Sequence, residues 1–144
     1  MAYWLFKSEP GTWSWTQQKA RGKDGEEWTG VRNYQSRNTM RAMKPGDKGF
    51  FYHSGGDKAV VGIVEIAKAA HRDSTARDGD WDCVDIRALM DVPRPVSLDA
   101  IKAERRLKGM VLVKNSRLSV QPVTAEEWKI VCELGGVKLP PRLT

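Results

Sequence analysis

Aromatic and hydrogen-bonding residues are mixed at three places where the expected strands end or turn. The three segments are residues 7–10 (Lys-Ser-Glu-Pro), 28–35 (Trp-Thr-Gly-Val-Arg-Asn-Tyr-Gln) and 50–54 (Phe-Phe-Tyr-His-Ser). Capture of a flipped or single-stranded base needs flat side chains for stacking and fixed donors and acceptors for the base edge. Convergence of the three segments would therefore produce a pocket for one base of a nucleic acid.

The same residues also have an ordinary structural interpretation. Trp28 and Tyr34 could close the core over a loop. Asn33 and Ser8 could satisfy nearby backbone groups. A histidine at a strand end, such as His53, is more often a hydrogen-bonded structural residue than a proton-transfer group. For any single residue the sequence leaves both interpretations open.

Motifs of the common enzyme classes are absent from the sequence. The only histidines are His53 and His71, and neither Cys83 nor Cys132 lies near a nucleophile elbow. The sequence has no Walker loop, no dinucleotide-binding glycine motif and no His/Cys/Glu cluster with metal-ligand spacing. We therefore expect no catalysis, no cofactor and no metal. The alternative is an enzyme acting on a nucleobase or small heterocycle, with Glu9 and His53 as acid and base.

The charge balance favours a polyanionic partner. Lys and Arg number 24 against 18 Asp and Glu, which gives a formal charge of +6. Such a surface attracts DNA or RNA, although it is also common as solubility charge. Arg37, Arg41 and Lys44 form a basic helical face that we expect to contact phosphates, the alternative being a solvated face. A small-molecule or protein-interaction module with incidental charge also stays open.

Length and cysteine usage suggest where and how the chain works. Its 144 residues are close to the commonest domain size, so we expect one domain over residues 1–144 and a monomer. Cys83 and Cys132 lack the spacing of a disulfide framework and are expected to be buried reduced thiols. Residues 2–6 are apolar but too few for a signal peptide. We therefore expect a cytoplasmic protein with no membrane contact.

Hydrophobic periodicity and turn residues predict an α+β chain. The expected strands are residues 3–7, 48–54, 59–67, 81–90, 110–114 and 118–120. The expected helices are a first one that Thr12 or Ser14 caps and that ends at Arg21, then 36–43 and 97–107, and a last one that begins at Thr124 and ends at Gly135. Pro93 and Pro95 are expected to end the fourth strand, and residues 22–30 to form a loop. This order favours a curved, largely antiparallel sheet or partial barrel flanked by short helices.

Six ordered segments of the sequence resemble those of the EVE domain family. They are YWLFKSEP, WTGVRNYQSRN, GDKGFFYHS, VVGIVE, WDCVDI and SRLSVQPVT, and they extend from residue 3 to about residue 136. The resemblance implies a PUA-like fold, akin to the YTH domains that read methylated adenine in RNA. It also implies a non-catalytic reader of a modified base in DNA or RNA, with modified cytosine proposed for several members.

Position by position, the resemblance implies a set of pocket residues. They are Ser8, Glu9, Trp28, Arg32, Asn33, Tyr34, His53, Ser54, Trp81, Arg117, Ser119 and Gln121. Ser8 and Asn33 are expected to hydrogen-bond the base edge, and Glu9 to accept from an exocyclic amine. One or more of the aromatic residues would stack on the base, which is worth about 1–3 kcal/mol.

Overall fold

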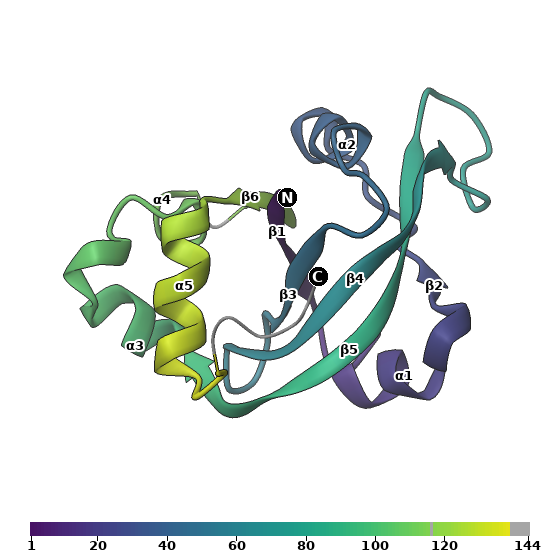
Figure 1. The fold of residues 1–144 in the computed structure, drawn as a ribbon. Coiled ribbons are helices and arrows are strands. Elements are labelled where there is room, and N and C mark those ends of the chain that lie inside the picture. Colours follow the sequence, from purple (N-terminus) through teal and green to yellow (C-terminus); the bar gives the residue numbers. More distant parts are fainter. Residues whose placement is uncertain (116, 139–144) are drawn as a thin grey trace.

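The computed structural model describes residues 1–115 and 117–138 and contains one six-stranded curved sheet (Figure 1). Its strands are β1 (Tyr3–Ser8), β2 (Glu26–Glu27), β3 (Lys48–His53), β4 (Ala59–Arg72), β5 (Asp82–Ser97) and β6 (Val120–Val123). They lie in the order β2-β5-β4-β3-β1-β6, with β1 and β3 parallel and the other neighbours antiparallel. Because β2 and β6 are free edges of this order, the sheet stays open. The predicted α+β class and largely antiparallel sheet are confirmed.

Helices cover both faces of the sheet (Figure 1). They are α1 (Trp15–Ala20), α2 (Tyr34–Arg41), α3 (Leu98–Ala103), α4 (Val111–Lys114) and α5 (Ala125–Leu134). One face carries α3, α4 and α5, and the other carries α1 and α2. No helix within residues 1–115 and 117–138 has both the length and the apolar character to cross a membrane.

The two faces follow from strict alternation along the central strands. On β1, Leu5 points into the core beneath α5, whereas Phe6 points into the core beneath α1 and α2. On β3, Phe50 and Phe51 divide in the same way. Successive side chains of a strand point to opposite faces, so a strand that is apolar throughout has to be buried on both.

The helix starts use the capping residues that the sequence offered. The Ser14 side chain accepts from the backbone N–H of Gln17, and Thr124 accepts from that of Glu127, each completing a capping box. The predicted helix at 36–43 begins two residues earlier, at Tyr34, because Asn33 is its cap. The predicted helix at 97–107 is α3 followed by a 3₁₀ turn.

Gly62 on β4 has a neighbour that requires a glycine. A glycine inside a strand is typical of a bulge or of a close approach to the backbone, and the structure shows both. The β4–β5 register shifts between Val60 and Gly62, and a Cβ on Gly62 would lie 2.2 Å from the Trp15 ring. The α1 tryptophan thus packs directly on the backbone of the sheet.

The expectation that Pro93 and Pro95 end a strand is wrong, since β5 continues to Ser97. The pairing of β4 with β5 shifts at this point, and both prolines are exposed in the resulting bulge. Between them, the Arg94 N–H donates to the carbonyl of Gly135 and not to the sheet. A proline is tolerated wherever the ladder requires no N–H.

The short apolar run at residues 110–114 was also predicted incorrectly, as a strand. It contains α4, and Met110 and Leu107 are both buried at a spacing of three. An apolar run of this length has no periodicity that separates helix from strand. The last strand lies at Val120–Val123, shifted from the predicted 118–120, and the predicted loop at 22–30 contains a 3₁₀ turn and β2.

The prediction that residues 1–144 form one domain includes residues 116 and 139–144, which lie outside the described residues.

Candidate nucleic-acid interface

A hollow opens beside the end of β1, between the turn that follows β1 and the segment that contains and follows β2. Its volume of about 480 Å³ falls in the range of roughly 300–1,000 Å³ that small-ligand sites occupy. Its walls are Lys7, Ser8, Glu9, Thr12, Trp13, Glu26, Glu27, Trp28, Thr29, Gly30, Val31, Arg32 and Ser119. The hollow is therefore built from two stretches of chain, 7–13 and 26–32, with one residue from the β6 approach.

Five of the predicted pocket residues line this hollow: Ser8, Glu9, Trp28, Arg32 and Ser119. Two of the three segments that the sequence singled out therefore converge. Their role in binding a base stays a prediction.

The third segment, residues 50–54, supports the hollow from outside. The Trp15 N–H donates to His53 Nε2 at 3.0 Å, so His53 fixes the start of α1. Burial lowers the pKa of His53 and favours the neutral ring that accepts this bond. The Ser54 hydroxyl donates to Glu9 Oε1 at 3.3 Å and thereby orients a side chain of the hollow.

Asn33 and Tyr34 lie outside the lining of the hollow. Asn33 Oδ1 accepts from the Ser36 N–H at 2.9 Å, which is the cap of α2. Tyr34 is 65% exposed and stacks on Trp81 with ring centroids 4.9 Å apart. The Arg37 guanidinium lies 4.9 Å from the Tyr34 ring centroid. These side chains form a separate aromatic and cationic surface.

The remaining predicted pocket residues are on the β6 side of the molecule. Arg117 is exposed and Gln121 is fully buried, and neither lines the hollow. Gln121 Nε2 donates to the Leu118 carbonyl at 2.7 Å.

The predicted phosphate-binding face is partly neutralised by acidic residues. Arg41 pairs with Asp80 and Asp82 at 2.9 and 2.8 Å, and Arg37 lies 3.6 Å from Asp80. Lys44 is exposed. The aspartates come from the loop between β4 and β5 and the start of β5, so they hold α2 against that hairpin.

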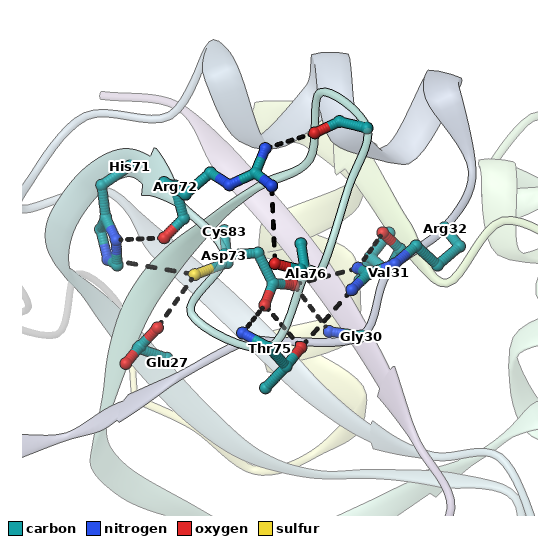
Figure 2. Close-up of polar contacts among 11 residues, drawn as sticks. Glu27, Gly30, Val31, Arg32, His71, Arg72, Asp73, Thr75, Ala76 and Cys83 are labelled. Carbon is teal, nitrogen blue, oxygen red and sulfur yellow. Dashed lines mark hydrogen bonds and ion pairs between the residues drawn. The ribbon is translucent and has the colours of Figure 1, made fainter.

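One wall of the hollow is pinned by Asp73, whose side chain is completely buried (Figure 2). Its carboxylate accepts from the Gly30 N–H at 2.9 Å, from Arg32 Nη1 at 3.1 Å, and from the N–H and hydroxyl of Thr75 at 2.7 and 2.6 Å. Burial alone would raise the pKa of Asp73, but these hydrogen bonds outweigh it and hold the pKa at about 2. The anion therefore fixes the 28–32 segment.

The chemistry of the hollow combines flat rings with carboxylates. Trp13 and Trp28 supply the rings, and the Ser8 hydroxyl donates to the Trp13 carbonyl at 2.5 Å, which fixes the Trp13 backbone. Three carboxylates, Glu9, Glu26 and Glu27, line the hollow with Lys7 and Arg32. Burial, followed by the nearby Lys58 charge, lowers the pKa of Lys7. Hydrogen-bond acceptors thus outnumber cations in the lining of a basic protein.

Sequence reasoning missed Trp13, Glu26 and Glu27 in the lining and Asp73 behind it. The two glutamates lie in a stretch expected to be loop, and Asp73 lies between two of the expected strands. The adjacent carboxylates just before Trp28 were the available signal. For Asp73 there was none, because its partner Gly30 is 43 residues away.

The chain is similar to known proteins in sequence and in fold. The family model of the EVE domain matches residues 2–134. The chain belongs to the EVE domain family. This EVE domain is 63% identical to the protein Atu2648 from Agrobacterium tumefaciens, with a TM-score of 0.95 and coverage of 98% of this chain and 97% of that one.

A human relative has been solved with DNA. The human THYN1 protein in complex with 5-methylcytosine-containing DNA is 35% identical, has a TM-score of 0.86, and matches over 97% of this chain and 100% of that chain. The YTH domain of the Zygosaccharomyces rouxii MRB1 protein is only 17% identical, with a TM-score of 0.55 over 93% of this chain and 86% of that one, and shares the fold. The predicted family and its relation in fold to YTH domains are confirmed.

Proposed function

We propose that this EVE domain is a non-catalytic reader that binds one modified base of a nucleic acid in the hollow beside β1. The observation that carries the proposal is a hollow of about 480 Å³ that combines Trp13 and Trp28 with three carboxylates. Rings can stack on any base, and carboxylates at the edge select among bases. The human relative solved with 5-methylcytosine DNA supports the proposal because it matches along nearly the full length of both chains.

The carboxylates favour a base that carries an exocyclic amine. A glutamate oxygen accepts from the N4 amine of cytosine or the N6 amine of adenine, whereas thymine and uracil present a carbonyl oxygen at the same place and would be repelled. Glu9 is oriented by Ser54 and is our first candidate for this contact. A modified cytosine is therefore the first ligand to test.

The aromatic surface outside the hollow suits the neighbouring nucleotides. The Arg32 guanidinium lines the hollow and also lies 5.5 Å from the Trp81 ring centroid, so this arginine connects the two places. Tyr34 offers an exposed ring next to Arg37. We propose that this surface contacts the strand next to the bound base, with Arg37, Arg41 and Lys44 near its phosphates.

The enzyme alternative has less support. Its proposed base, His53, lies outside the hollow, and its Nε2 already accepts from the Trp15 N–H. Glu9 would therefore have to act without His53. We therefore propose binding without turnover, which recovery of unaltered oligonucleotide after prolonged incubation with the protein would check.

We further propose that the protein works as a monomer in the cytoplasm. Two buried, unpaired cysteines, Cys83 and Cys132, are compatible with a reducing compartment. Fractionation of cells and light scattering of the purified protein test the two points separately.

The decisive experiment is a binding screen over single- and double-stranded oligonucleotides. The panel carries cytosine, 5-methylcytosine, 5-hydroxymethylcytosine, N6-methyladenine or thymine at one position, at two salt concentrations. We expect a preference for one modified base with an exocyclic amine, and binding that weakens with salt.

Two variants locate the binding site, and one variant is the control. Trp13→Ala should reduce affinity by about 1–3 kcal/mol, or roughly 5- to 150-fold, because a stacking ring is lost. Glu9→Gln should reduce the discrimination between amine and carbonyl bases. Glu126→Gln on α5, an exposed carboxylate on the other face, should change neither. Wild-type affinity and discrimination in both hollow variants would refute this assignment.

A further inference from the structure

Four metal-ligating side chains gather where β2, β5 and β4 run side by side. The register pairs Glu27 of β2 with Asp85 of β5, and Cys83 of β5 with His71 of β4. Cys83 and Asp85 are two residues apart, so they face the same side of the sheet. Cross-strand partners on one face lie close together, so the register alone brings the four side chains to one place.

The ligand atoms point toward one another, as Figure 2 shows for Glu27, His71 and Cys83. Cys83 Sγ is 3.6 Å from Glu27 Oε1 and 4.0 Å from His71 Nε2, and the three ligand atoms lie within 4.8 Å of one another. Asp85 Oδ1 lies 2.6 Å from the same His71 nitrogen. Ligand atoms around a tetrahedral zinc ion are roughly 3–4 Å apart, given metal–ligand distances of about 2.0–2.3 Å.

The orientation of His71 gives an independent indication. Its Nδ1 faces the Arg72 carbonyl oxygen at 3.1 Å, while Nε2 faces the Asp85 carboxylate. In metal sites the far ring nitrogen commonly donates to a backbone carbonyl, which leaves the near nitrogen free for the metal. With oxygen acceptors on both sides, Nε2 has to hold either a second proton or a metal cation.

We propose that Glu27, His71, Cys83 and Asp85 form a binding site for a divalent metal of the zinc type. A thiolate and an imidazole select zinc over magnesium or calcium, which prefer oxygen ligands alone. The two carboxylates complete a four-ligand set, and the short contact between His71 and Asp85 opens to admit the ion. The site holds β2, which has only two residues, against β5 and β4.

Metal binding at this site displaces protons from its ligands. Burial, and then the negative charges of Glu27 and Asp73, raise the pKa of the Cys83 thiol to about 12, so the free site keeps its thiol proton. The hydrogen bond that His71 donates to the Asp85 carboxylate raises the pKa of His71, which favours the imidazolium. Zinc binds the thiolate and the neutral imidazole, so the thiol proton and any proton held by His71 are released on binding.

The site adjoins two hollows. A second hollow of about 340 Å³ reaches two of the four ligands, Glu27 and Asp85. Its lining has four carboxylates, which include Asp24 and Glu26, against the two cations Arg21 and Lys68, so its net charge is negative and favours the approach of a cation. Glu27 also lines the base hollow. The ion would therefore stabilise one wall of the base hollow. Metal binding itself does not depend on the proposed reading of a base.

The sequence predicted no metal because the ligands have no motif spacing. Glu27, His71 and Cys83 belong to three different strands, and only the sheet register brings them together. Short-range motifs such as paired cysteines could not reveal such a site.

The test uses the full chain without an affinity tag, stripped with a chelator and titrated with Co²⁺. We expect one equivalent to produce a thiolate-to-cobalt charge-transfer band, which zinc then abolishes by displacement. Cys83→Ser should lose the band, and the matched Cys132→Ser, which removes the other buried thiol, should keep it. Calorimetry of zinc binding in buffers of different ionisation enthalpy should show net release of protons.

Two outcomes would overturn the proposal: no band with equimolar Co²⁺ in the folded wild type, or the same zinc affinity in wild type and Cys83→Ser. If Cys83→Ser does not fold, Glu27→Gln and His71→Asn take its place, and each should weaken zinc binding at least tenfold. Unchanged affinity in both would equally overturn it. Because metal binding is measured without nucleic acid, its failure and failure of the base-reading proposal are distinguishable.

Discussion

The two faces of the sheet use tryptophan in opposite ways. Under α5, Trp128 is stacked between Phe50, with ring centroids 4.0 Å apart, and Tyr3, at 4.5 Å. On the other face, Trp28 meets Phe6 and Phe51 at steep angles of 71° and 83° and lines the hollow. Within the part of the chain that the structure describes, no ring stacks parallel to Trp28. Trp28 is itself only 8% exposed, so the two faces differ in the geometry of the ring contacts and in the hollow that lies beside Trp28.

The largest expected effect comes from replacing the two tryptophans separately. Trp128→Ala should lower the free energy of unfolding by about 3–5 kcal/mol, because a ring enclosed on both sides leaves a dry cavity. Trp28→Ala should cost less stability, since water from the hollow can fill part of the space, but it should weaken nucleic-acid binding. Urea denaturation and oligonucleotide titration measure the two quantities. If both variants lost the same stability and bound nucleic acid with the same affinity, the proposed difference between the two faces would be wrong.

A second comparison concerns Asp73, which anchors one wall of the hollow. Its pKa of about 2 is below the usual 3.8, so its carboxylate contributes about 2 kcal/mol of stability above pH 4. That contribution is lost as the pH falls through 4 toward 2. The Asp73→Asn variant should therefore have a lower free energy of unfolding at pH 7, and this free energy should change less between pH 5 and 2. It should also bind nucleic acid more weakly, because Gly30 and Arg32 lose their anchor.

The matched change on the α5 side is Glu104→Gln. The hydrogen bond from Arg106 holds the pKa of Glu104 at about 2 as well, but this carboxylate lies on the side of α3 and α5. Glu104→Gln should change the stability at low pH only slightly and should leave the affinity for nucleic acid unchanged. A loss of affinity equal to that of Asp73→Asn would show that acidic charge in general, and not the pinned wall, controls binding.

A smaller effect is expected at the glycine that receives Trp15. Gly62→Ala places a methyl group against the indole and should cost about 1–3 kcal/mol by overpacking. Gly11→Ala meets nothing within 4 Å and is the control. Thermal unfolding of both variants checks this point, and equal melting temperatures would mean that α1 moves freely over the sheet.

The smallest expected effect is at Asn33, which was predicted to contact the base and caps α2 in the structure. Asn33→Ala should cost about 1 kcal/mol of stability, while Asn33→Ser keeps a capping oxygen and costs a few tenths. Both variants should keep nearly the wild-type affinity. A tenfold loss of affinity in both would instead indicate a direct contact of the amide with the nucleic acid.

Local signals predicted much of the fold. The capping residues Ser14 and Thr124 marked helix starts because a cap depends on atoms within three residues. Alternation and turns located β1, β3 and β4 for the same reason. The bulge around Pro93 and Pro95 and the helix at residues 111–114 depend on what lies opposite them, which the local pattern does not contain.

The candidate site was predictable only in part. The segments at 7–10 and 28–35 were identified by composition, and both reach the hollow. Which of their side chains face it depends on distant partners. Arg32 turns to Asp73, 41 residues away, which the local pattern does not contain, whereas Asn33 caps its own helix, the local alternative that the sequence left open.

The position of β1 has a consequence for how the chain matures. β1 is flanked by β3 on one side and by β6, at Val120–Val123, on the other, so it is synthesised long before one of its two neighbours. Until that late segment leaves the ribosome, one edge of β1 has unpaired N–H and C=O groups and an apolar face, a combination that promotes intermolecular pairing. The native sheet is thus completed only after β6 has been translated, and nascent chains that stall before residue 120 should be the ones that aggregate or require a chaperone.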